Sequence, residues 1–306
     1  MRTSLSISAI LGGLVAGLGL LVLIGWDSSN INLVLVHPSF VAMQYNTALG
    51  FLLSGIAIMV LHRRRGLVSA LLAVCVLLLG SLTLAEYLWN LNLGIDTLFD
   101  SYFIDADFRA MYAQGSLAHP HRMAPNTAFC FSLVGLSIWL ASRPHGEGYA
   151  ASISSLGCVV FALGVVSFTG YLAGAESLFG WGGLAVMAIH TSAGFMVLGG
   201  GLFTYGLRLY HQGKEHQGVP VWLVWPIAIL GLSITSTLWM GLNAYRDSLG
   251  NHIDDYSSYA AESMLLFGFS STVALIMALR SRLSEDAEPL AARSLYKAPL
   301  VVVVLG

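Results

Sequence analysis

The sequence predicts an all-α protein, a bundle of helices that span a membrane, and three observations support this fold class. Charged residues make up only 10% of the 306 residues, whereas hydrophobic residues make up 56%. The mean hydropathy is +0.75. A soluble domain of this length needs far more charge to cover its surface. The apolar residues also gather in runs that are long enough to cross a hydrocarbon core of about 30 Å.

Eight such runs are expected to form membrane-spanning helices. The first follows Arg2 and reaches Trp26, which is the length of a retained span and not of a cleaved signal peptide. A ninth apolar run starts at Leu300 and is cut at Gly306, so we expect the natural polypeptide to continue. The eight predicted helices begin near Leu5, Asn46, Leu67, Asn126, Ala150, Ala188, Trp222 and Met264.

Three short segments repeat one motif: "MQYNTALGF" at 43–51, "MAPNTAFCF" at 123–131 and "MAIHTSAGF" at 187–195. Each opens the second helix of a predicted hairpin, in which one helix crosses the membrane and the motif helix returns. A two-helix unit ends on the side where it started, so the three copies share one orientation. Residues 1–210 are therefore predicted to form a six-helix bundle with pseudo-threefold symmetry. Residues 211–306 would supply two further helices beside it and the start of the ninth.

The distribution of basic residues predicts the orientation of the chain. With the N-terminus on the cytoplasmic side, only Arg109, Arg122 and Arg246 of the 14 basic residues fall outside. The longest external loop, from about Asn90 to Met123, contains helical spacing over 97–115, which predicts a helix lying on the membrane surface. The three cysteines lie within apolar runs and are interpreted as small buried hydrophobic residues.

The Asn or His of each motif falls in the first turn of its helix, at the outer end of the bundle. Two interpretations are open. These side chains satisfy the free N–H groups of the helix start, or they form an outward-facing polar pocket where the three starts converge. In the second interpretation, His190 is the member whose charge changes near neutral pH. The candidate ligand-binding residues are Asn46, Thr47, Glu86, Tyr87, Asn126, Thr127, His190 and Thr191.

Three longer stretches carry a family resemblance. They are "EYLWNLNLGIDTLF" at 86–99, "HPHRMAPNTAFCFSLVGLSIWL" at 119–140 and "GYLAGAESLFGWGGLAVMAIHTSAGFMVLGGGL" at 170–202. Together they resemble the N-terminal membrane region of bacterial signalling proteins, in which this region precedes cytoplasmic PAS, histidine kinase or diguanylate cyclase domains. The resemblance covers roughly residues 5–245.

The resemblance implies a sensory input module in the bacterial inner membrane that passes an external or membrane-borne cue to a cytoplasmic output domain. It also implies a homodimer formed through signalling domains outside this sequence, the lipid bilayer as partner, and no nucleic acid. The chain departs from the family in two respects. It contains no PAS, kinase or cyclase segment, and a short acidic stretch at 245–263 replaces an extracytoplasmic sensor module.

Other functions remain open from the residues alone. A transporter is disfavoured because intramembrane charges mark transport pathways, and here only Glu86, Glu176 and His190 approach the spans. Haem or quinone binding is a further alternative, and haem would have His190 as its one candidate axial ligand on a spanning helix. Thioether and imidazole groups suit copper, although Met side chains also fill gaps between helices. No motif predicts an enzyme in this chain, and the cofactor stays unassigned. The candidate metal ligands are His190, Met187, His119 and His121.

Overall fold

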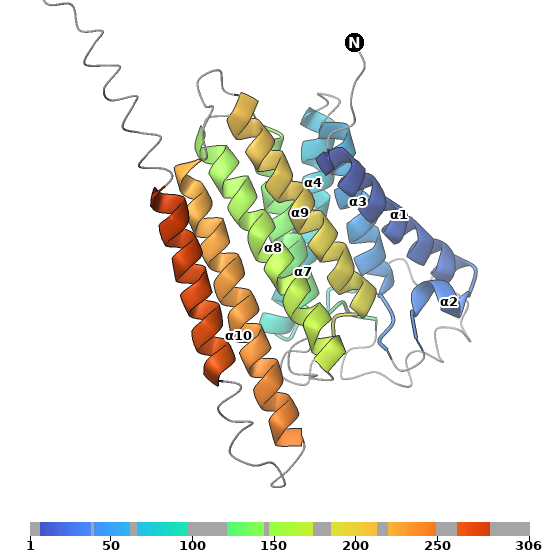
Figure 1. Cartoon of the computed structure of the whole chain (residues 1–306). Coiled ribbons are helices and arrows are strands. Elements are labelled where there is room, and N and C mark those ends of the chain that lie inside the picture. Colours follow the sequence, from blue (N-terminus) through green and yellow to red (C-terminus); the bar gives the residue numbers. More distant parts are fainter. Residues whose placement is uncertain are drawn as a thin grey trace, which may run out of the picture.

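A computed structural model describes residues 7–37, 40–61, 66–96, 121–143, 147–173, 185–212, 220–248 and 262–281. Its elements are helices, and these ranges contain no β-strand, so the all-α prediction is confirmed. The long helices run side by side (Figure 1). In chain order they are α1 (Ile7–Asp27), α2 (Ile31–Val34), α3 (Tyr45–Leu61), α4 (Gly66–Leu88), α7 (Pro125–Ala141), α8 (Glu147–Ala173), α9 (Ile189–Gln212), the 3-10 turn η2 (Val221–Leu223), α10 (Val224–Ser248) and a last helix, Glu262–Ser281.

Several helices are long and apolar enough to cross a membrane, as expected of a multi-pass membrane protein. Five in the described ranges meet this criterion: Ile7–Asp27, Gly66–Leu88, Tyr149–Leu172, Val221–Met240 and Glu262–Ser281. Helices α3 and α7 are apolar but have 17 residues each. At 1.5 Å per residue they reach about 26 Å, a little less than the hydrocarbon core.

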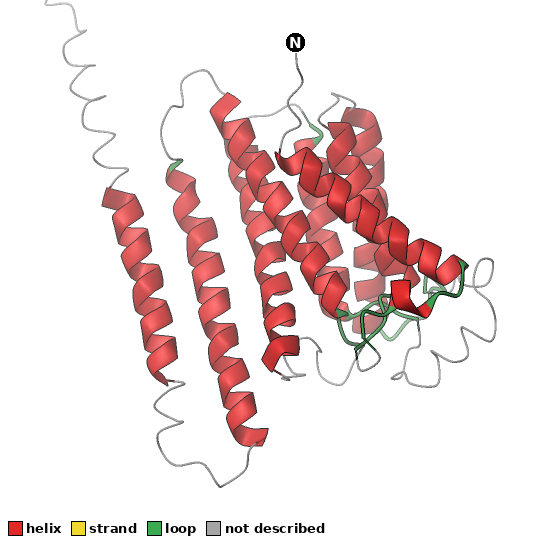
Figure 2. Ribbon diagram, turned by 45° about the vertical axis from the view of Figure 1, so that its right-hand side comes forward, coloured by secondary structure: helices red, strands yellow, loops and turns green. Residues whose placement is uncertain are grey.

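Three pairs of consecutive long helices make the most extensive contacts: α1 with α3, α4 with α7, and α8 with α9. Contacts of α3 with α4, α7 with α8 and α9 with α1 join these pairs into a closed ring. Helices α3, α7 and α9 also touch one another, so they line the centre of the bundle. In Figure 2 these helices form the compact part of the molecule.

Glycines on the outer helices let the backbones of each pair approach closely, as small residues do between membrane helices. A Cβ atom on Gly19 would lie 2.5 Å from the carbonyl oxygen of Ala48, and one on Gly80 would lie 2.5 Å from that of Ala128. At Gly164 the corresponding distance, to Ser192, is 2.8 Å. Ala48, Ala128 and Ser192 occupy the same position in the three motifs, two residues after Asn or His.

Substituting Gly19 tests this close approach. Gly19→Val places side-chain atoms against the α3 backbone, and we expect it to lower the free energy of unfolding by about 1–3 kcal/mol. The matched control is Gly17→Val, in the same helix, because no atom lies within 4 Å of a Cβ at Gly17. Both variants are measured by reversible unfolding in mixed detergent. Equal losses for the two would contradict the α1–α3 contact.

The centre of the bundle is filled by three phenylalanine rings, one from each motif. Phe51, Phe131 and Phe195 are each 0% exposed. Their ring centroids lie 4.8 to 5.1 Å apart with interplanar angles of 52° to 66°, within the range that favours edge-to-face and tilted aromatic contacts. The ring of Phe131 covers Gly50, where a Cβ would lie 2.6 Å from its Cζ atom. These rings close the middle of the bundle.

The last two helices lie beside this bundle. Helix α10 packs on α8, and the last helix packs on α10, where Gly231 meets Thr272 and Gly268 meets Thr235. They are the orange and red helices at the edge of Figure 1. The predicted surface helix within 97–115 lies outside the described residues.

One prediction about the cysteines is wrong. Cys130 and Cys158 are buried, but Cys75 is exposed. Cys75 lies on a face of α4 that also exposes Leu71 and Leu78. The apolar residues around Cys75 in the sequence therefore belong to an outward-facing side of the helix and not to the core.

Candidate functional site

The polar groups of the bundle gather at one end, which we call the polar end: the end where α1, α4 and α8 finish and α3, α7 and α9 begin, at the bottom of Figure 1. Here each helix pair is closed by the same hydrogen bond. An aromatic side chain near the end of the first helix donates to the backbone carbonyl of the motif Met, two residues before the second helix. The three bonds are Trp26 Nε1 to Met43 O (2.9 Å), Tyr87 OH to Met123 O (3.1 Å) and Tyr171 OH to Met187 O (2.8 Å).

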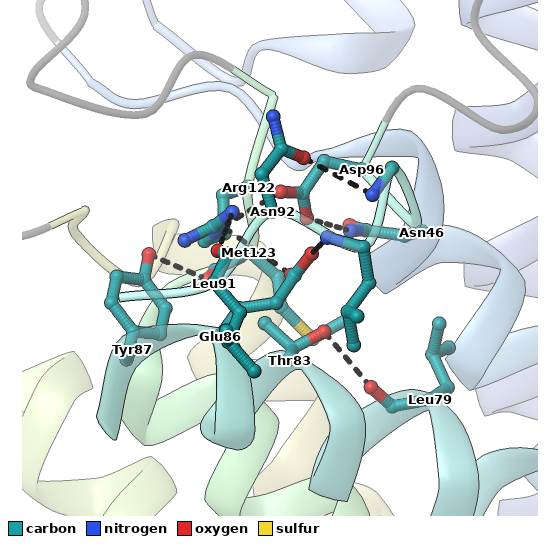
Figure 3. Close-up of polar contacts among 12 residues, drawn as sticks. Asn46, Leu79, Thr83, Glu86, Tyr87, Leu91, Asn92, Asp96, Arg122 and Met123 are labelled. Carbon is teal, nitrogen blue, oxygen red and sulfur yellow. Dashed lines mark hydrogen bonds and ion pairs between the residues drawn. The ribbon is translucent and has the colours of Figure 1, made fainter. Parts of the chain in front are cut away.

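A buried charge cluster lies at the polar end, around Arg122 (Figure 3). Arg122 Nε lies 2.7 Å from Asp96 Oδ2 and 3.4 Å from Glu86 Oε2. The three side chains are 3%, 8% and 0% exposed for Arg122, Asp96 and Glu86. Glu86 belongs to the last turn of α4, and Arg122 is the third residue before the start of α7. With two carboxylates and one guanidinium, the cluster carries a formal charge of one negative unit.

Further contacts hold the cluster in place. Glu86 Oε1 accepts a 2.7 Å hydrogen bond from the backbone N–H of Leu93, and Arg122 Nη2 donates to the Leu91 carbonyl at 3.3 Å. The guanidinium of Arg122 lies 5.2 Å from the centre of the Tyr87 ring. The cluster is thereby tied to the hydrogen bond between Tyr87 and Met123.

Asn46 joins the cluster from α3. Its Nδ2 group donates to Asp96 Oδ1 over 3.5 Å, and the residue is 3% exposed. Asp96 thus bridges Asn46 and Arg122 with its two carboxylate oxygens. The structure therefore brings together three of the predicted site residues, Asn46, Glu86 and Tyr87.

Unpartnered buried atoms are concentrated at the polar end. Within the described residues, six buried side-chain nitrogen or oxygen atoms have no hydrogen-bond partner. One is Trp222 Nε1, and the other five are Asn46 Oδ1, Glu86 Oε2, Arg122 Nη1 and both ring nitrogens of His190. Buried polar atoms are nearly always hydrogen-bonded in folded proteins, so this concentration makes the polar end the candidate functional site.

The other predicted residues lie at the same end of the bundle. Asn126 is 2% exposed, and its Oδ1 accepts from the backbone N–H of Thr127 at 2.9 Å, which is the helix-start role that the sequence left open. The His190 ring approaches the backbone of Val34 outside good hydrogen-bond geometry. Thr47, Thr127 and Thr191 are 2%, 1% and 1% exposed.

Two members of the cluster, Asp96 and Arg122, were missed as site residues. A signal for Arg122 was present, since it directly precedes Met123 of the second motif and is one of few basic residues on its side of the predicted membrane. No such signal marks Asp96, which lies ten residues beyond Glu86 in a non-helical segment.

The predicted metal ligands are only partly described. Met187 is 1% exposed within the hydrophobic core, His121 lies in a turn with a φ of 68°, and His119 lies outside the described residues. The described part of the chain contains no group of three His, Cys, Asp or Glu side chains that could hold a metal ion. Copper binding through thioether and imidazole groups stays a prediction.

The polar end is the candidate site because of the groups that it gathers. It offers a buried carboxylate oxygen, an amide oxygen, a guanidinium N–H and an imidazole, each without a hydrogen-bond partner. Comparisons with protein-family models, with curated proteins and with solved structures find no match to this chain.

Proposed function

We propose that this chain is the membrane-embedded sensory input module of a bacterial signal-transduction protein, which binds a small polar ligand at the polar end. The observation that carries the proposal is the group of five buried, unpartnered polar atoms on Asn46, Glu86, Arg122 and His190. The signal would pass to a cytoplasmic output domain that this sequence does not contain. The bacterial inner membrane as location, a cytoplasmic N-terminus and a dimer formed through the output domains belong to the same proposal.

The proposed architecture has eight membrane spans, with the first six arranged as three repeated hairpins around a pseudo-threefold axis. Three sets of contacts support this arrangement. The aromatic-to-Met hydrogen bonds recur in each helix pair, the close glycine contacts recur at one motif position, and the three motif phenylalanines meet at the centre. Each set relates equivalent positions of the three motifs.

The phenylalanine cluster favours a receptor over a transporter. Phe51 follows Asn46 by five residues, so its Cα lies about 7–8 Å deeper along α3. Beyond the charge cluster, a polar ligand entering at the polar end would meet three fully buried aromatic rings and not a continued row of the charged side chains that mark transport pathways. The site therefore suits reversible binding from one side.

A second candidate function, binding of a metal or haem, is favoured by one observation. Both ring nitrogens of His190 are buried and unpartnered, and a neutral imidazole with a free nitrogen is a common ligand of transition metals. Met187, three residues earlier, supplies a thioether on the same segment. Copper titration of the purified chain, monitored by ligand-to-metal charge-transfer absorption, tests this candidate. Absorption that appears with the unmodified chain and is lost in His190→Asn would support metal binding.

The test of the sensory function is His190→Asn, which gives the third motif the residue found in the other two. In the full-length polypeptide, we expect this variant to shift the ligand dose needed for half-maximal output by at least about tenfold, because it replaces the imidazole of the site by a shorter amide that cannot reach the same partners. The matched control is His211→Asn, at the exposed far end of the same helix. A dose–response curve like that of the unmodified protein would make His190 structural. Output that no external compound alters would contradict the sensory function itself.

A further inference from the structure

We infer that the ligand of the polar end is a compact organic cation that carries N–H donors, a primary ammonium compound. This inference rests on the proposed function and deepens it by naming the ligand class. The ammonium group would bind Glu86 Oε2 and Asn46 Oδ1, two buried oxygens without a hydrogen-bond partner, with Arg122 beside them at 3.4 Å from Glu86 Oε2. Figure 3 shows the side chains of Asn46, Asp96, Glu86 and Arg122 directed toward one another.

The charge balance of the cluster favours a cation over an anion. Glu86 and Asp96 supply two carboxylates, and among the described residues the positive charge that contacts both is that of Arg122. Arg122 is shared unequally, at 2.7 Å from Asp96 and 3.4 Å from Glu86, so the carboxylate of Glu86 is the less compensated one. A buried, uncompensated carboxylate is strongly unfavourable. An anionic ligand would add to the imbalance, whereas a cation removes it.

The unpartnered atoms specify hydrogen-bond donors on that cation. Glu86 Oε2 and Asn46 Oδ1 are both acceptors, and both lie on residues that are at most 3% exposed. An ammonium group donates up to three hydrogen bonds, and bonds between ionised partners are the strongest of this type. The free Nη1 group of Arg122 is a donor, so the ligand also fits better if it carries a hydroxyl or carbonyl oxygen near its nitrogen.

A bare metal ion fits this site less well. Calcium and magnesium take six or more oxygen ligands, and the described residues hold no group of three side chains suited to a metal. The guanidinium of Arg122 already contacts both carboxylates and would repel a second compact positive charge on the same oxygens. A divalent ion meets about twice the repulsion from this guanidinium that a singly charged ammonium group meets at the same distance.

Two sources could supply a primary ammonium at this place: a soluble amine, or the headgroup of phosphatidylethanolamine. The polar end lies at the ends of the long apolar helices, within reach of both. The shared chemistry is a protonated amine with an oxygen two carbons away, for which ethanolamine is the simplest probe.

The experiment is calorimetric titration of the full chain in phosphatidylcholine nanodiscs, which expose both ends of the bundle. Three probes, which all carry a hydroxyl group, separate the need for a positive charge from the need for N–H donors. Ethanolamine has the positive charge and the N–H donors, choline has the charge without N–H donors, and N-acetylethanolamine has lost the charge. We expect ethanolamine to bind, choline to bind at least about tenfold more weakly and N-acetylethanolamine not to bind, because charge-assisted hydrogen bonds are lost in turn.

Substitutions in the charge cluster test whether ethanolamine binds there. Glu86→Gln keeps the shape of the side chain and removes the charge, and we expect it to weaken ethanolamine binding by about tenfold or more. Glu262→Gln makes the same change at an exposed position of the last helix and should leave binding unchanged. Asn46→Leu, which removes only the amide, serves as a second test should Glu86→Gln fail to fold, and it should also weaken binding.

Each outcome decides a separate question. No ethanolamine binding to the unmodified chain, or equal binding to the unmodified chain and the Glu86 and Asn46 variants, overturns the ligand class. If His190→Asn still alters signalling in that case, the sensory function stands and only the ligand class is wrong. Repeating the titration in nanodiscs that contain phosphatidylethanolamine identifies the source. Weaker binding there points to the lipid headgroup, and unchanged binding points to a soluble amine.

Discussion

Arg122→Met is expected to lower the free energy of unfolding by about 3–5 kcal/mol, the range for breaking a buried ion pair by removing one partner. The reason is the pair of carboxylates left behind. Asp96 would lose its 2.7 Å contact and Glu86 its 3.4 Å contact, while both stay buried. The hydrogen bond to the Leu91 carbonyl and the contact with the Tyr87 ring would be lost as well.

Two comparisons isolate this effect in reversible unfolding in mixed detergent. Arg280→Met makes the same change at an exposed position of the last helix, and it should alter stability by less than about 0.5 kcal/mol. Adding Glu86→Gln and Asp96→Asn to Arg122→Met should recover much of the loss, because no buried charge is then left unpaired. A loss for Arg122→Met no larger than that for Arg280→Met would contradict the buried cluster.

Phe131→Ala is expected to lower the free energy of unfolding by about 3 kcal/mol, at the lower end of the range for large-to-small core substitutions. The ring of Phe131 contacts those of Phe51 and Phe195 at 5.1 and 4.9 Å between centroids. Removing it leaves a cavity at the centre of the bundle. We expect a value at the lower end of that range because helices that separate within a bilayer remain in an apolar solvent. The lost stability then reflects lost packing contacts and not the transfer of the ring from water.

Phe129→Ala, two residues earlier in α7, is the matched control. Phe129 is 37% exposed, so its loss leaves no enclosed cavity, and we expect a change below about 1 kcal/mol. The two variants differ only in the direction of the substituted ring on one helix. Comparable destabilisation by both would mean that the three phenylalanines do not form the centre of the bundle.

The helices were largely predictable because their signal is local. Apolar runs placed the helix starts near Asn46, Leu67 and Asn126, and the structure starts α3, α4 and α7 at Tyr45, Gly66 and Pro125. Pro125 marks its boundary directly, since a proline fits the first turn, where no N–H partner is needed. Exposure was less predictable, as Cys75 shows, because a helix that is apolar on all sides gives little indication of which face packs inward.

The site was predictable only in part, because its members come together through contacts distant in the chain. The motifs identified Asn46 and His190, and Glu86 stood out as an acidic residue at the end of an apolar run. Asp96 and Arg122 are 26 residues apart, and Asp96 and Asn46 are 50 residues apart. No periodicity of a helix or strand links such positions, so the ion pair emerges only when the helices are assembled.

The ring of helix contacts also constrains the order in which the bundle can be completed during synthesis. Each hairpin brings together neighbouring segments, and the Trp26–Met43 bond spans only 17 residues, so such a unit can form soon after it enters the bilayer. Helix α1, however, contacts α9, which ends at Gln212. Until that helix has been inserted, the first-made hairpin keeps one flank open, and Phe51 lacks Phe195 as a neighbour. During synthesis, the surface of α1 that will contact α9 therefore stays exposed to lipid, and it is covered when the helix of the third motif is inserted.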